Sequence, residues 1–185
     1  ESGLVISDGK SNLDLPRRAS SPQPNLEKQA EGAVSGSPLV TPLAVVGDAV
    51  YGGNQGGRLS RYSLPDLEPL EEIPLGGSVV WGPYSVGDYL LLTTSDNQMV
   101  CVGSDGSVAW QQGLEHGHAT DSPLMDGDTA TVTWQQSGLS QVDLTNGAVS
   151  GYLELPQPVV TGPIAFGKRL LLASADGALL ILDRP

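Results

Sequence analysis

The sequence predicts an all-β chain built from a repeated unit of about 40 residues. Four glycines lie 40 residues apart, at Gly47, Gly87, Gly127 and Gly167, and a proline precedes each one by four or five positions. Short apolar runs separated by turn residues fill the rest of each period, and the 3.6-residue spacing of long amphipathic helices is absent. The fixed period indicates a repeat architecture.

The unit is clearest over residues 76–115, where four strands are expected. The first ends at Gly82-Pro83, and Gly87-Asp88 forms the tight turn to the second. In the other copies Asp-Gly and Asn-Gly pairs mark later hairpins. The expected strands are 78–81, 89–94, 98–102 and a fourth that starts at Ser107.

Stacking of such sheets around an axis would produce a β-propeller, because a single four-stranded sheet cannot bury both of its faces. The second strands, such as 89–94, are nearly continuous apolar runs, as expected of sheets covered on both sides. A flat sandwich of hairpins fits the period but gives no reason for its regularity. The predicted division is a partial blade with a Pro/Ser-rich loop (1–33), three blades (34–75, 76–115 and 116–155) and a partial blade (156–185).

Both end segments are predicted to be incomplete blades. Residues 4–9 resemble residues 172–177 and are expected to begin the second and third strands of a preceding copy. The stretch 15–24, rich in Pro and Ser, is expected to be an exposed loop, and Leu26-Glu27 aligns with a fourth strand. Three arrangements stay open: a piece of a larger propeller, one blade shared by both ends, or two chains joined in a ring.

The charge distribution argues against polyanionic partners. Formal net charge is −12, and no Lys or Arg occurs between Arg61 and Lys168. Such a surface repels nucleic acid and anionic lipid. No run of 18 or more apolar residues is present, so no transmembrane segment is expected. The acidity provides solubility or a docking face for a cationic partner.

One cysteine is present, Cys101, within the apolar run 99–102. It excludes an intrachain disulfide and a cysteine-based metal site, and it is expected to be a buried, inert thiol. Three tryptophans, Trp81, Trp110 and Trp134, are expected to fill the core between blades rather than to form a sugar-stacking platform.

One stretch has the composition of a metal site. His116 and His118 would project to the same side of an extended segment and could bind zinc, copper or nickel, with Asp121 adding an oxygen. The segment is expected to lie near the central channel of a propeller. The competing interpretation is a connecting loop that carries two solvated histidines.

The phrase that spans residues 86–110 resembles the repeat of the pyrroloquinoline-quinone-like propellers. Blades of that family close with a Gly-x-x-x-Trp element whose tryptophan docks between neighbouring blades, and residues 106–110 match it. Tyr152 is the nearest aromatic residue after Asn146-Gly147, one step out of register. The resemblance extends over about residues 34–183.

The resemblance implies one of two functions. The quinone-dependent dehydrogenases of the family use calcium ligands and often a vicinal cysteine pair, which this chain lacks. The non-enzymatic branch, which includes an outer-membrane assembly lipoprotein, implies a periplasmic or extracytoplasmic scaffold without cofactor. Its partners would be proteins or further blades that complete the ring, within a larger cell-envelope assembly. The alternatives are a fragment of a quinone-dependent dehydrogenase and a propeller that binds a metal or small molecule.

Overall fold

The computed structural model describes residues 4–19, 25–34 and 36–185. In these ranges all 18 regular elements are β-strands, and they form five antiparallel sheets. The prediction of an all-β chain is confirmed. Within the same ranges, no helix has the length and apolar character needed to cross a bilayer.

Three sheets have four strands each, joined in sequence order as meanders. Each lies inside one of the segments predicted from the repeat, although the boundaries between those segments stay a prediction. The sheets contain β4 (Ala44–Val46), β5 (Ala49–Gly53), β6 (Arg58–Ser63) and β7 (Ile73–Pro74); β8 (Val79–Val86), β9 (Tyr89–Thr94), β10 (Gln98–Gly103) and β11 (Val108–Gly113); and β12 (Leu124–Asp126), β13 (Thr129–Trp134), β14 (Gly138–Asp143) and β15 (Val149–Glu154).

The two end sheets have three strands each. Their strands are β1 (Ile6–Ser7), β2 (Asn12–Ala19) and β3 (Asn25–Ala33) at one end, and β16 (Ile164–Phe166), β17 (Arg169–Ala173) and β18 (Leu179–Asp183) at the other.

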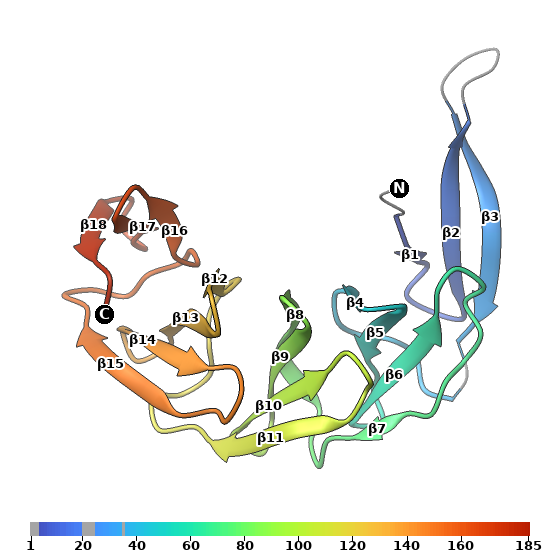
Figure 1. Cartoon of the computed structure of the whole chain (residues 1–185), viewed down its shortest axis with the longest axis horizontal. Coiled ribbons are helices and arrows are strands. Elements are labelled where there is room, and N and C mark those ends of the chain that lie inside the picture. The colour runs from blue at the N-terminus through green and yellow to red at the C-terminus, as the bar shows by residue number, and fades with distance from the viewer. Residues whose placement is uncertain (1–3, 20–24, 35) are drawn as a thin grey trace.

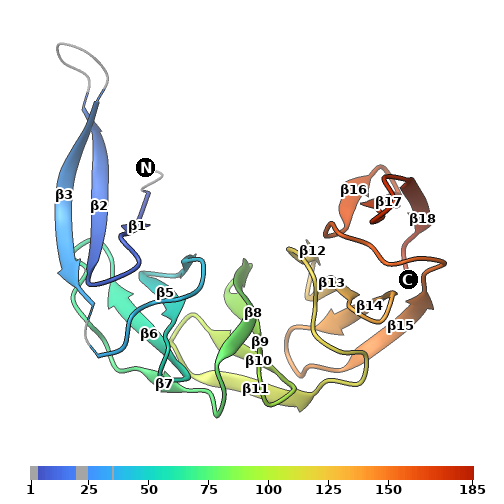
Figure 2. The ribbon, with the colours of Figure 1, turned by 180° about the vertical axis from the view of Figure 1, so that it is seen from behind.

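The five sheets follow one another around an open arc, with the N-terminal sheet at one end and the C-terminal sheet at the other (Figure 1). In each four-stranded sheet the first strand lies on the concave side of the arc and the last strand on the convex side (Figure 1). The view from behind shows the same order (Figure 2). This radial stacking of meanders is the arrangement of β-propeller blades.

The periodic glycines make the turns between first and second strands, as predicted. Gly47, Gly87, Gly127 and Gly167 have φ angles of 60°, 60°, 62° and 61°. The residue after each glycine has no positive φ, so the turns have the pattern of type II′, which places glycine first. A side chain at these positions would strain the backbone, and this explains the period.

Strand β8 is longer than the sequence indicated. The strand predicted to end at Gly82-Pro83 instead runs from Val79 to Val86. Its pairing with β9 shifts register between Val79 and Trp81 and again between Trp81 and Tyr84. Bulges of this kind absorb a proline that cannot donate to the ladder, so the strand continues past it.

Residues 15–19, expected to begin an exposed loop, belong to a strand instead. Strand β2 continues to Ala19, and a register shift between Leu15 and Pro16 accommodates the proline in its pairing with β3. The rest of that expected loop, residues 20–24, lies outside the described residues. The hairpin of β2 and β3 therefore projects well beyond the other strands (Figure 1).

Four apolar clusters fill the four boundaries between consecutive sheets. Strand β9 shows how they alternate: Leu90 and Leu92 pack toward the sheet of β4–β7, whereas Leu91 packs toward that of β12–β15. All three leucines are fully buried. The predicted coverage of both faces is thus confirmed, and the core is a row of separate interfaces rather than one centre.

Candidate functional site: the seam between the two central sheets

The boundary between sheet β8–β11 and sheet β12–β15, here called the central seam, is anchored by Trp110. The Trp110 ring lies on Gly147 in the β14–β15 turn, where no larger residue would fit. Its indole Nε1 donates a 2.8 Å hydrogen bond to the carbonyl oxygen of Leu144. The tryptophan docks between neighbouring blades, as the Gly-x-x-x-Trp resemblance implied.

The other two tryptophans also belong to this boundary. Trp81 and Trp134 join Trp110 in the same buried cluster. Trp81 donates to the carbonyl of Asp121 at 2.8 Å, and Trp134 donates to the Ser140 hydroxyl at 2.7 Å. The prediction that the tryptophans form inter-blade core is confirmed.

The segment 114–123 crosses the seam from the outer strand β11 to the inner strand β12. Backbone hydrogen bonds hold it: Leu114 N donates to Asn97 O, Gln135 N to His118 O and Thr120 N to Thr133 O, at 2.9, 2.9 and 3.0 Å. The segment is therefore anchored to both sheets that it joins.

The two predicted histidines meet different neighbours. The imidazole of His116 stacks on the ring of Tyr152 in the outer strand β15, with centroids 3.9 Å apart and an interplanar angle of 22°. His118 Nδ1 lies 3.1 Å from the Thr93 hydroxyl on β9. The segment was expected to lie near the central channel of a propeller; within it, His116 lies beside the outer strand β15.

Asp121 lies further along the segment and serves the backbone. Its Oδ2 accepts from Gly162 N at 2.9 Å, and its Oδ1 accepts from Ser122 N at 2.7 Å. Among residues 4–19, 25–34 and 36–185, no three His, Cys, Asp or Glu side chains gather closely enough to hold a metal ion. The structure does not assemble His116, His118 and Asp121 into one cluster, and metal binding there stays a prediction.

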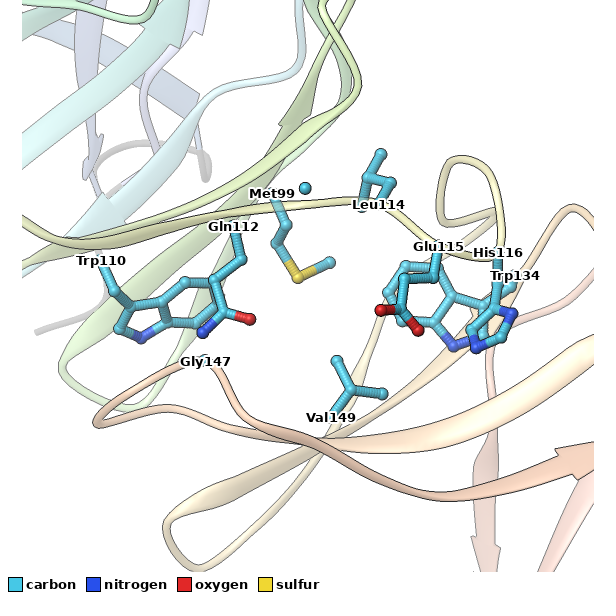
Figure 3. Close-up of a pocket in the computed structure, with 10 residues that line it drawn as sticks. Met99, Trp110, Gln112, Leu114, Glu115, His116, Trp134, Gly147 and Val149 are labelled. Carbon is cyan, nitrogen blue, oxygen red and sulfur yellow. The ribbon is translucent and has the colours of Figure 1, made fainter.

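A pocket of about 170 Å³ opens in the central seam (Figure 3). Its apolar wall comes from both sheets and includes the Met99 thioether and the Val149 side chain. Polar groups are contributed by Gln112 and by the carboxylate of Glu115 in the linking segment. The ten lining residues are Met99, Trp110, Gln112, Gly113, Leu114, Glu115, His116, Trp134, Gly147 and Val149.

Other residues whose side chains could take part in chemistry instead stabilise the fold. Cys101 is fully buried, as predicted, and burial raises the pKa of its thiol to about 12, so it carries no thiolate at neutral pH. Asp105 and Asp143 accept hydrogen bonds within their own turns, chiefly from Ser107 and Thr145, and these bonds lower the pKa of each carboxyl. Their role is turn formation.

Sequence reasoning missed the partner of His116. Tyr152 lies across Gly138 on the adjacent strand β14, where any side chain would collide with its ring. The one signal in the sequence was the aromatic residue after Asn146-Gly147, which is one step out of register with the Gly-x-x-x-Trp element. In the structure the Tyr152 ring stacks on the His116 imidazole.

Taken together, these features define a β-propeller of the pyrroloquinoline-quinone-like repeat class. Residues 44–184 match the family described as outer membrane protein assembly factor BamB, and the chain belongs to that family. Comparison with curated proteins gave no match.

Solved structures show the same fold at low sequence identity. BamB from Moraxella catarrhalis aligns with a TM-score of 0.76 and 16% identity, over 98% of this chain and 55% of that one. BBS1N, in a complex with ARL6DN, aligns with a TM-score of 0.73 and 14% identity, over 99% of this chain and 56% of that one. The C-terminal WD40 domain of Sif2 aligns with a TM-score of 0.70 and 11% identity, over 99% of this chain and 55% of that one. The chain spans about half the length of these proteins.

Proposed function

We propose that the chain is a non-catalytic propeller scaffold that mediates protein–protein interaction within a larger, extracytoplasmic cell-envelope assembly. The family match over residues 44–184 carries the proposal, because the family is described as an assembly factor. The central seam supports it, since its tryptophans and hydrogen-bonding carboxylates hold blades and turns together. Propellers of similar fold also occur in protein complexes, as with BBS1N and ARL6DN.

Site-specific photo-cross-linking in the native cells tests this function. A photoreactive residue would replace exposed Val80 on the inner strand β8 or exposed Gln111 on the outer strand β11. We expect one envelope protein to be captured from one side of the arc and not from the other. Capture of the same partner in the cytosol would retain the scaffold and refute the envelope location. No specific adduct from either side would refute the scaffold.

The dehydrogenase alternative requires a separate assay. Purified protein would be incubated with pyrroloquinoline quinone, calcium and a set of alcohols and sugars, with reduction of a dye as the readout. We expect no turnover. Quinone-dependent dye reduction would replace the scaffold proposal with an oxidoreductase.

A further inference from the structure

The pocket in the central seam presents hydrogen-bond acceptors. The indole N–H groups that line it already donate to other atoms. The side-chain oxygen of Gln112 and the carboxylate of Glu115 both point into it from opposite sides (Figure 3). The Gln112 amide nitrogen already donates to Asn146 O at 2.9 Å. The indole N–H groups of Trp110 and Trp134 are engaged by Leu144 O and the Ser140 hydroxyl.

We propose that this pocket binds the side chain of a lysine or arginine from a partner protein. Lysine and arginine side chains carry several donors and no acceptor, which complements two inward-facing acceptors. Their long aliphatic stems suit the apolar wall formed by Met99 and Val149, while the charged head meets the Glu115 carboxylate. The inference rests on the proposed scaffold function and names the chemistry of its partner.

The charge distribution supports a cationic ligand. No Lys or Arg occurs between Arg61 and Lys168, so neither central sheet contains a basic residue that could occupy the pocket from within. His116 is the one ionisable base among the lining residues, and its ring is stacked on Tyr152. The formal net charge of −12 would also attract a basic segment during encounter. An anionic ligand would meet repulsion from Glu115 and from the molecule as a whole.

The size and rigidity of the pocket also favour a single side chain. Its volume of about 170 Å³ is below the roughly 300–1,000 Å³ of sites for drug-sized ligands. The backbone on either side of Glu115 is held by bonds from Leu114 N to Asn97 O and from Gln136 N to His116 O, at 2.9 and 3.4 Å. His116 is further fixed by its stack on Tyr152. These contacts fix the backbone that carries the exposed Glu115 side chain, which reduces the ordering cost of binding.

Titrations with short capped peptides followed by NMR would test the pocket. The probes are Ala-Arg-Ala, Ala-Lys-Ala and Ala-citrulline-Ala, where citrulline keeps the length of arginine without its charge. With only two methionines and three tryptophans in the chain, the Met99 methyl and the Trp110 and Trp134 indole signals can be assigned. We expect these signals to shift with the arginine or lysine peptide, and the stronger of the two identifies the preferred head group.

Two variants and a control make the test decisive. Glu115→Gln should weaken binding of the basic peptide about fivefold, as expected for loss of one exposed charge pair. Val149→Phe should fill the pocket and abolish the shifts at unchanged charge, because Val149 is half exposed and tolerates a larger residue. Glu71→Gln removes an exposed carboxylate from the segment between β6 and β7, outside the central seam, and should change nothing.

Equal binding of the citrulline peptide, or full affinity in Glu115→Gln, would overturn the cation pocket. If cross-linking captures a partner that Glu115→Gln still binds normally, the scaffold stands and the pocket proposal fails. If the basic peptide binds the pocket but cross-linking captures nothing, the pocket stands and the scaffold fails.

Discussion

The two end sheets differ in the surface that each turns away from the rest of the arc: mainly apolar on the last sheet, and charged with fewer apolar side chains on the first. On the last sheet, Leu170 and Leu172 pack inward, so the alternate face presents exposed Ile164, Leu179 and Ile181, with the Arg169–Asp183 ion pair beside them. On the first sheet, Leu13 and Leu15 pack inward, and the alternate face carries Asp14 opposite exposed Ile6.

The charged face of the first sheet is organised around one lysine. Lys28 Nζ lies 3.0 Å from both an Asp14 oxygen and a Glu31 oxygen. The contrast with the last sheet follows from the repeat. Met99 and Cys101 of β10 occupy the positions of Leu179 and Ile181, and the next sheet buries them. The apolar face is thus a property of the repeat, whereas its burial depends on the neighbour.

The largest expected effect is a difference in stability between equivalent positions, one buried in the central seam and one exposed on the last sheet. Met99→Ala should lower the free energy of unfolding by about 2–5 kcal/mol, because Met99 is 3% exposed in the central seam. Leu179→Ala should change it by no more than about 0.5 kcal/mol, because Leu179 is 68% exposed. Urea unfolding of both variants measures the difference. Similar losses would mean that the last face is covered in solution.

The second effect concerns association of residues 1–185 at high concentration. The apolar face of β16–β18 should promote self-association, since a contiguous exposed apolar patch is an association site. Ile181→Asp should weaken that association at least tenfold, about the effect of one buried aliphatic side chain. Sedimentation equilibrium measures it, with Asp14→Asn on the charged face as control. Equal weakening by both variants would place the contact elsewhere.

The third effect tests a feature that the two end sheets share. Hydrogen bonds from the Asn12 and Lys10 backbones lower the pKa of Asp8, and bonds from the Ser174 hydroxyl and the Ala178 backbone lower that of Asp176. Both carboxyls therefore stabilise the fold above their ordinary value of 3.8 and lose that contribution as pH falls below about 4.

Replacing either aspartate by asparagine should flatten the decline of stability between pH 5 and about pH 3. Thermal unfolding across that range provides the measurement, and unsubstituted protein is the reference. An unchanged slope in both variants would show that these turn bonds do not form in solution.

The smallest effect is expected at Lys28. Bonds to Glu31 and Asp14 raise the pKa of its ammonium group, so its contribution is present below about 10.5 and is lost as pH rises through the raised value. Because the group is exposed, Lys28→Ala should destabilise the protein only slightly, and 1 M salt should remove the difference. Unfolding at low and high salt checks this. A salt-independent loss would indicate that the lysine stem packs instead.

Much of the fold could be predicted because its signals are local. A glycine with positive φ is required at each turn from first to second strand, so the chemistry of one residue produces the period of Gly47, Gly87, Gly127 and Gly167. The end of strand β8 was predicted wrongly at Gly82-Pro83. Whether a bulge lets a strand continue past a proline depends on the strand that it pairs with, and this is not a local signal.

The sequence alone therefore determined the repeat, its first turns and most of its strands, since these follow from side-chain chemistry and the two-residue period of a strand. Only the tertiary structure decided how the linking segment meets the strands on either side of the central seam. The stacking of His116 on Tyr152 and the pocket between Glu115 and Gln112 join separate strands and a linking segment. Their contacts depend on how one sheet is rotated against the next, and no local pattern encodes that angle.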